Sequence, residues 1–198
     1  MSAELSSKER MEETPSGGNS KNSGNSKKNF IDESIDWIKS IVVTFIIVVL
    51  VFTFVARTAI VNGSSMVPTL TNGDFLVLWS LFYTPKQGDI ISANCDGLDE
   101  VIVKRVIAVG GQTVDIDFST GEVFVDGELL DEPYINNLTL NDEGAFDYPI
   151  TVEEGYYFCM GDNRQGSKDS RHPDVGLISR DDILGKVVLR LFPNTKFF

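Results

Sequence analysis

The feature that most constrains this chain is a run of seventeen residues, 40–56, without a single charge. The run lies between Lys39 and Arg57 and consists mainly of valine, isoleucine and phenylalanine. An α-helix rises about 1.5 Å per residue, so the run would span about 25 Å. Trp37 and the snorkelling cations at both ends bring it close to the roughly 30 Å of a bilayer core. The sequence therefore predicts a transmembrane helix over residues 37–60.

Other interpretations of this run fit less well. A buried helix of a soluble protein is one alternative, and the many β-branched residues would even permit two buried strands. Against this alternative, residues 40–56 show no amphipathic face, and cations bound the run. A cleaved signal peptide would lie at the extreme N-terminus, whereas about forty mainly hydrophilic residues come first. The cations at both ends favour an uncleaved signal-anchor helix.

The distribution of cations predicts an orientation. Six lysines and arginines lie in residues 1–39, and after Arg57 the next cation is Lys86. Cytoplasmic flanks of membrane helices are enriched in Lys and Arg. We therefore expect a cytoplasmic tail over residues 1–36 and an extracytoplasmic domain over residues 61–198, in a single-pass protein of the plasma membrane. The tail is rich in Ser, Asn and Gly, and is expected to be disordered.

Composition excludes several classes of protein. The 29 acidic residues outnumber the 17 lysines and arginines, and 22 of the acids lie in residues 40–198, which argues against nucleic acid as a partner. An apolar content of 42% is too high for a wholly disordered chain. Two cysteines and one histidine cannot build a four-cysteine zinc site or a multi-histidine centre, so no metal or cofactor is expected. Cys95 and Cys159 are expected to be separate buried thiols, although a disulfide is open.

The part of the chain after the apolar run has the pattern of a β domain. Short β-branched or aromatic runs alternate with turn residues such as Asn-Gly-Asp and Gly-Gly. Residues 114–118 and 122–125 alternate around Ser-Thr-Gly, which is typical of a hairpin. The predicted fold class is mainly β, built from antiparallel sheet after one transmembrane helix, with strands at 75–79, 89–93, 101–107, 114–118 and 122–125.

A serine nucleophile needs a base beside it. A Ser-His-Asp arrangement would have to use His172, the only histidine, which lies in a segment crowded with Asp and Arg. The other option pairs Ser64 or Ser65 with a lysine. Lys104 is unusual because it interrupts an apolar run over residues 101–109, although a solvated lysine on an edge strand would give the same pattern.

Four segments, in the same order, resemble the sequence boxes of bacterial type I signal peptidases, the S26 family. They follow an N-terminal anchor, and the resemblance covers roughly residues 38–192. The segments are S-S-M-V-P-T-L at 64–70, G-D-I at 88–90, V-K-R-V-I followed by G-G within 103–111, and M-G-D-N-R-Q-G-S-K-D-S-R at 160–171.

The resemblance implies a serine/lysine dyad, with Ser65 as nucleophile and Lys104 as general base. Ser167 would hydrogen-bond and orient the lysine amine, and Asp169 would pair with Arg171. A lysine near its ordinary pKa of about 10.4 is a poor base at neutral pH. Burial disfavours its charged form and lowers the pKa, and the expected apolar surroundings are Val101, Val103 and Val106.

Two further positions belong to this implied site. Asp162 would be the acidic residue at the start of the last box. Gly63 stands where many Gram-negative members carry a serine that completes the oxyanion hole, so the chain looks Gram-positive-like. The Ser65 N–H would then be one oxyanion donor, and sequence leaves the second donor open.

The implied activity is that of a serine endopeptidase that removes N-terminal signal peptides from exported preproteins. Sites of the A-x-A type would be cut at the outer face of the membrane, so preproteins and the lipid bilayer are the expected partners. Shallow apolar subsites, or alternatively plain core, are expected at Val61, Met66, Leu76, Val101 and Val103. Two other functions are weighed against this one: a non-catalytic tethered β domain that binds exported segments, and a self-cleaving Ser-Lys repressor.

Overall fold

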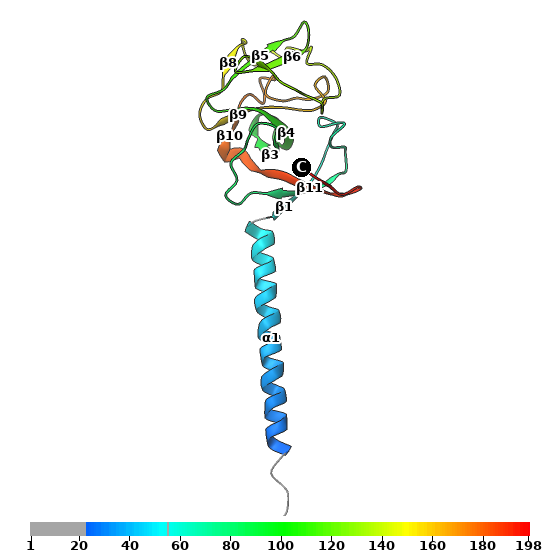
Figure 1. Cartoon of the computed structure of the whole chain (residues 1–198), viewed down its shortest axis with the longest axis vertical. Coiled ribbons are helices and arrows are strands. Elements are labelled where there is room, and N and C mark those ends of the chain that lie inside the picture. The colour runs from blue at the N-terminus through cyan, green and yellow to red at the C-terminus, as the bar shows by residue number, and fades with distance from the viewer. Residues whose placement is uncertain (1–22, 55) are drawn as a thin grey trace, which may run out of the picture. The chain divides into compact units, whose positions relative to one another are not determined.

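The structure is a computed structural model that describes residues 23–54 and 56–198 (Figure 1). The chain divides into two units, residues 1–47 and 48–198, and each is described by itself. The first 22 residues of the tail expected over residues 1–36 lie outside the described residues. The remainder of that segment is helical rather than disordered.

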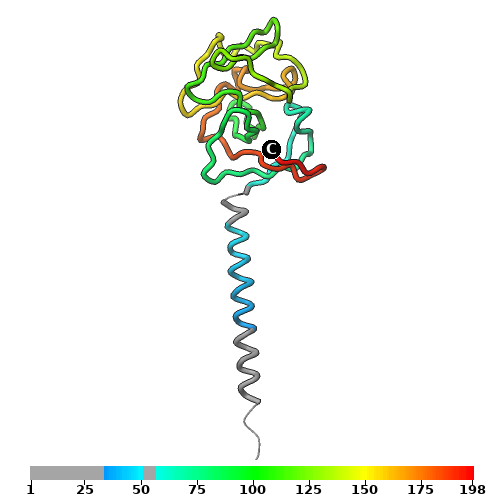
Figure 2. Tube along the Cα trace, viewed as in Figure 1, coloured from blue at the N-terminus to red at the C-terminus, as the bar shows by residue number. Residues whose placement is uncertain are grey.

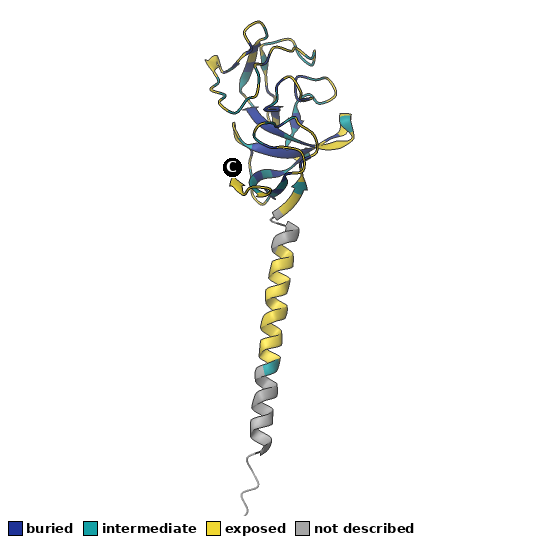
Figure 3. Ribbon diagram, turned by 90° about the vertical axis from the view of Figure 1, so that its right-hand side faces the viewer, coloured by how far each residue is buried: buried dark blue, intermediate teal, exposed yellow. Residues whose placement is uncertain are grey.

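Helix α1 (Ser23–Phe54) is 32 residues long and replaces the helix expected over residues 37–60. It begins earlier because a nucleated helix extends at little cost through residues such as Lys and Glu. It ends earlier because residues 56–60 pair as a strand with Phe75–Trp79. The side chains from Ile35 to Leu50 are exposed (Figure 3). Within the described part of the chain, no helix has both the length and the apolar character needed to cross a membrane.

The larger sheet contains eight strands and is antiparallel throughout. Figure 2 traces the path of the backbone through this part of the chain. Strand β12 (Lys196–Phe197) pairs with β11 and lies off the main path. The order of the other strands is β1 (Ala56–Ile60), β2 (Phe75–Trp79), β11 (Ile183–Phe192), β3 (Ile90–Cys95), β4 (Glu100–Val109), β9 (Tyr156–Met160) and β10 (Ile178–Ser179).

The smaller sheet contains four antiparallel strands, and the pairing of residues 114–117 with residues 122–125 confirms the predicted hairpin. In the next turn, Asp126 and Gly127 both have positive φ, at 54° and 81°, which is the conformation that a tight hairpin turn requires. Residues 56–198 otherwise contain only two short 3₁₀ helices, η1 (Asp96–Leu98) and η2 (Arg180–Asp182). The mainly antiparallel β class is thus confirmed, and the order of this sheet is β7 (Glu128–Leu129), β6 (Glu122–Val125), β5 (Thr113–Asp117) and β8 (Ile150–Thr151).

Three clusters of buried apolar side chains hold the two sheets in place. One cluster joins β4 and β9 to the smaller sheet, and Phe158 at its centre is fully buried against Phe146 and Tyr148. A second cluster contains Cys95 and Cys159, which are both free thiols, as expected. The third contains Val61, Met66 and Leu70. The segment that carries the candidate serines is therefore anchored in the core at both ends.

Truncation of Phe158 to alanine is expected to lower the free energy of unfolding by about 3–5 kcal/mol, because it leaves a cavity between the two sheets. Urea unfolding of the full chain, followed by circular dichroism, measures the change. Leu129→Ala is the matched control, because Leu129 is 58% exposed and its truncation should cost less than about 0.5 kcal/mol. Equal unfolding midpoints for the two variants would contradict this account of the core.

Candidate active site

The segment between β1 and β2 presents Ser65 at the edge of the core. Met66 and Leu70 are buried and joined by a backbone hydrogen bond of 2.9 Å from the Leu70 N–H to the Met66 carbonyl. Just before Met66 in the chain, Ser64 is exposed and Ser65 is half-buried. Gly63 has a φ of +97°, a left-handed conformation that favours glycine. The turn thus holds Ser65 inward and Ser64 outward.

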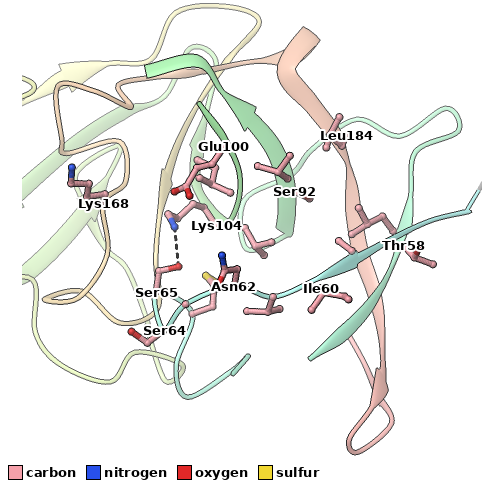
Figure 4. Close-up of a pocket in the computed structure, with 18 of the residues that line it drawn as sticks. Thr58, Ile60, Asn62, Ser64, Ser65, Ser92, Glu100, Lys104, Lys168 and Leu184 are labelled. Atoms are coloured by element: carbon pink, nitrogen blue, oxygen red, sulfur yellow. Dashed lines mark hydrogen bonds between the residues drawn. The ribbon is translucent and has the colours of Figure 1, made fainter. Parts of the chain in front are cut away.

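Strand β4 brings Lys104 to this serine. Lys104 Nζ donates a hydrogen bond of 2.9 Å to Ser65 Oγ, across 39 residues of sequence (Figure 4). The register of β3 and β4 sets Lys104 opposite Ile91. Alternation along β4 places Ile102 and Val106 on the same face, and all three apolar residues are buried. The surroundings of the lysine therefore differ from the expected Val101 and Val103, because strand alternation puts those two residues on the opposite face.

Burial of Lys104 has a direct electrostatic consequence. The side chain is only 4% exposed, and loss of hydration lowers the pKa of its amine below the ordinary value of 10.5. The carboxylates of Asp169 and Glu100 act in the opposite direction, because negative charge favours the ammonium form. Burial is the larger effect, so the pKa is lowered and the neutral amine is more populated at a given pH.

Two buried ion pairs hold the loop that follows β9. Asp162 accepts hydrogen bonds of 2.8 and 2.7 Å from Arg105, the residue after Lys104. Asp169 accepts two hydrogen bonds of 2.8 Å from Arg171, as the sequence predicts for this pair, and both side chains are fully buried. Removing either partner of such a pair would leave an uncompensated buried charge, at a cost of about 3–5 kcal/mol. The loop is thereby tied to the strand that carries the lysine.

Ser167 lies in this loop but does not make the contact expected of it. Its side chain is 4% exposed, and its hydroxyl has no hydrogen-bond partner within the described residues. A Cβ atom added to Gly161 would collide with Ser167 and with the Ser65 carbonyl. Glycine at 161 therefore permits this loop to pack closely on the turn that carries Ser65. The orienting role of Ser167 stays a prediction.

A cleft of about 640 Å³ opens beside the Ser65–Lys104 pair (Figure 4). Four of the five expected subsite residues line it, namely Val61, Met66, Val101 and Val103. Leu76 does not line the cleft; it is fully buried, which agrees with the alternative expectation of plain core packing. Val101 is 53% exposed and stands at the margin.

His172 lies apart from this pair. Its Nδ1 accepts a hydrogen bond of 3.1 Å from the Asp174 N–H, and it does not line the cleft. Nothing in the described part of the chain joins it to Ser65, so the geometry favours a lysine over a histidine as the base. The described residues also contain no cluster of three or more His, Cys, Asp or Glu side chains that could hold a metal ion.

Sequence reasoning missed the contacts of two residues in the loop after β9. Arg164 is fully buried and donates to Glu132 and to Thr139, which lie 25–32 residues earlier. Asn163 donates hydrogen bonds to the carbonyls of Ser64 and Ser65. Both residues lie inside the segment 160–171 that the sequence singled out, but nothing in the pattern indicates their partners. A fully buried arginine needs an anionic partner, but the burial of Arg164 is visible only in the structure.

Comparison with known proteins identifies the family of this chain. The family model described as signal peptidase, peptidase S26, matches residues 34–192. Signal peptidase I P of Bacillus subtilis subsp. natto is 40% identical over 169 residues, which cover 80% of this chain and 89% of that protein. Signal peptidase IB of Staphylococcus aureus (strain Mu50 / ATCC 700699) is 33% identical over 182 residues, or 83% and 93% of the two chains.

A crystal structure of a signal peptidase I from Enterococcus faecalis V583 is 28% identical in sequence, with a TM-score of 0.44. It covers 53% of this chain and 97% of that one. The family match extends over most of the chain and includes all four sequence boxes. The chain therefore belongs to the signal peptidase family, peptidase S26, as a type I signal peptidase, and is a hydrolase.

Proposed function

We propose that this chain is a membrane-anchored serine endopeptidase that removes N-terminal signal peptides from exported preproteins with a Ser65–Lys104 dyad. The observation that carries the proposal is the 2.9 Å contact between Lys104 Nζ and Ser65 Oγ. Burial lowers the pKa of this amine, which is the change that a lysine base requires. Family membership supplies the reaction class, and the relatives named above are themselves called signal peptidases.

The reaction follows from this pair. The neutral amine of Lys104 accepts the Ser65 hydroxyl proton as Oγ attacks the carbonyl carbon at the −1 position of the precursor. Collapse of the tetrahedral intermediate breaks the C–N bond, and the ammonium returns its proton to the leaving amine. Water then attacks the acyl-enzyme, Lys104 takes the proton from that water, and the proton passes back to Ser65 as the ester bond breaks.

The cleft supports selection of small side chains at the −1 and −3 positions. Val61 and Met66 are packed against the core, and Val103 is half-buried, so the wall has apolar surface but little depth. A methyl group fits such a surface, whereas a larger side chain would have to displace core residues at a cost of about 1–3 kcal/mol. This is the basis on which we propose cleavage at A-x-A sites, with Ser167 and the Asp169–Arg171 pair supporting the dyad.

The uncharged run over residues 40–56, most of which lies in α1, is proposed as the membrane anchor. Six lysines and arginines precede the run, whereas after Arg57 the next cation is Lys86. This asymmetry predicts a cytoplasmic N-terminal tail and a β domain outside the plasma membrane, beginning at β1. An anchored domain meets translocated precursors where they emerge, which raises the effective concentration of the scissile bond at the site.

Ser65→Ala and Lys104→Ala are each expected to lower preprotein cleavage by at least about a thousandfold, because the first removes the nucleophile and the second its base. Ser64→Ala should keep activity within about twofold, since Ser64 is exposed and faces away from the amine. Cleavage of a purified preprotein by the full chain in detergent micelles is the measurement.

Lys86→Ala is the control for loss of a positive charge, because Lys86 is exposed and distant from the cleft. A precursor with bulky residues at −1 and −3 should stay uncut by every variant. Near-normal cleavage by Lys104→Ala would refute the dyad, and cleavage of the bulky precursor would refute the A-x-A preference.

The cleavage rate is expected to rise with pH and to level off once the Lys104 amine is neutral. Because burial lowers the pKa of this amine, the midpoint of the rise should lie below 10.5. The profile of kcat against pH, measured with substrate in excess, reports this value for the enzyme–substrate complex. A rise that reaches its midpoint only at 10.5 would show that the amine is not the buried base proposed here.

Arginines at Ile46 and Val49 are expected to release the chain from membranes, because each costs about 2.5–3.5 kcal/mol at the centre of a membrane helix. Alkaline carbonate extraction of cell membranes followed by immunoblotting measures the retained fraction. The control carries arginines at Asn22 and Asn25, outside the uncharged run. Release of the unmodified chain by carbonate, or retention of the Ile46→Arg/Val49→Arg variant, would argue against the anchor.

A further inference from the structure

Asn163 contacts both peptide groups that flank the Ser65 backbone. Its N–H donates a hydrogen bond of 2.9 Å to the Ser65 carbonyl. Its side-chain Nδ2 donates a second hydrogen bond, of 3.2 Å, to the Ser64 carbonyl across 99 residues of sequence. A carbonyl oxygen can only accept, so the amide group that faces Ser64 is the NH₂ and not the oxygen. Asn163, in the loop after β9, thus holds the turn that carries Ser65 through two hydrogen bonds to its backbone.

The hydrogen bond from Asn163 to the Ser64 carbonyl also orients the Ser65 N–H. A peptide group is planar, and its C=O and N–H point to opposite sides of one rigid unit. The Ser64 carbonyl accepts from the Val67 N–H at 3.2 Å within the turn and from Asn163 outside it, so the rotation of this peptide is restrained from two directions. The Ser65 N–H on the other side of the plane donates to no group in the described part of the chain.

The free Ser65 N–H differs in this respect from the N–H two residues earlier. The Gly63 N–H already donates to Asn72 Oδ1 at 2.9 Å. It is therefore occupied within the turn, whereas the Ser65 N–H is available to a substrate. An oxyanion donor acts by being held in place before charge develops, so its orientation is what the protein must secure.

We infer that Asn163 is a positioning residue for the oxyanion hole: its side-chain amide holds the Ser64–Ser65 peptide so that the Ser65 N–H faces the developing oxyanion. The inference rests on the proposed function, because an oxyanion forms only if Ser65 attacks a carbonyl. Asn163 does not itself line the cleft, and its hydrogen bonds go to the backbone carbonyls of Ser64 and Ser65 and not to the Ser65 hydroxyl or the Lys104 amine. It acts through the backbone of the nucleophile.

The residues around Asn163 hold its side-chain amide in a fixed position. Its neighbours in sequence, Asp162 and Arg164, are fully buried and ion-paired to Arg105 and Glu132. The Gly166 N–H donates to the Asn163 carbonyl at 3.0 Å and closes the turn. A Cβ atom at Gly166 would press directly on the Asn163 amide. Glycine at 166 leaves the room in which this amide reaches Ser64.

The test compares Asn163→Ala and Asn163→Asp with the unmodified full chain in detergent. Each variant is expected to lose roughly five- to tenfold in kcat, about the effect of one hydrogen bond, while KM changes by less than twofold. Asn163→Asp should be the slower of the two, because its carboxylate would face the Ser64 carbonyl. The pH at which kcat reaches half its plateau should stay the same, since Lys104 is untouched.

The affinity for a peptide aldehyde ending in Ala-x-Ala distinguishes a positioning role of Asn163 from a merely structural one. The aldehyde adds to Ser65 Oγ and places a tetrahedral oxygen at the oxyanion hole, so its affinity should fall five- to tenfold in the variants. The corresponding peptide alcohol forms no such adduct and should bind equally to all. Gly166→Ala should reproduce the loss, whereas Gln165→Ala, an exposed neighbour with an intact Asn163, should not.

Several outcomes would overturn the inference. These are an unchanged kcat in Asn163→Ala, an equal loss of affinity for the aldehyde and the alcohol, or a loss of cleavage that merely follows the unfolded fraction seen by circular dichroism. Failure of the proposed function would look different: the unmodified chain would leave the precursor uncut, or Ser65→Ala would still cleave it. That result would remove the oxyanion and the inference with it.

Discussion

Burial of one amine is the constraint on which the site depends. Lys104 can serve as a base only if the cost of burying its charged form exceeds the pull of nearby carboxylates, in a domain where acids outnumber bases two to one over residues 40–198. Asp169 exerts the largest such pull, and both of its oxygens are bonded to Arg171. This pairing supplies a compensating positive charge beside the carboxylate and weakens its effect on the amine. The Asp169–Arg171 ion pair therefore helps to keep the pKa of Lys104 low and also stabilises the conformation of the loop.

Sequence pattern was sufficient for the elements whose signal is local. Residues 75–79 are a short run of apolar and aromatic residues, residues 122–125 alternate, and the two segments form β2 and β6 as expected. The bounds of α1 were wrong at its C-terminal end, because Ala56–Ile60 pairs with β2 through a register that no local pattern reveals. Strand β11 was not predicted at all. Its neighbours β2 and β3 come from distant parts of the chain, and only their assembly with β11 makes it a central strand.

Some residues of the site could likewise be predicted from the sequence, and others could not. Ser65 and Lys104 could be named because they lie in segments that resemble known boxes, and the structure places their side chains in contact. Leu76 was included among the subsites by its position relative to the boxes, with core packing as the alternative, and the structure places it in the core. Asn163 could not be found from residues alone, because its partners are backbone carbonyls, which are present at every position.

The loop after β9 gains its rigidity from bonds that add little stability. A buried Arg–carboxylate pair roughly offsets its own desolvation cost, so Asp162–Arg105, Asp169–Arg171 and Glu132–Arg164 do not explain why the domain folds. They explain why this loop has one conformation, since any displacement would separate charges already stripped of water. Residues 161–171 can then hold the turn that carries Ser65 through Asn163 and strand β4 through Arg105 at once. The distance between Ser65 and Lys104 is thus set by a third segment, which contains neither residue.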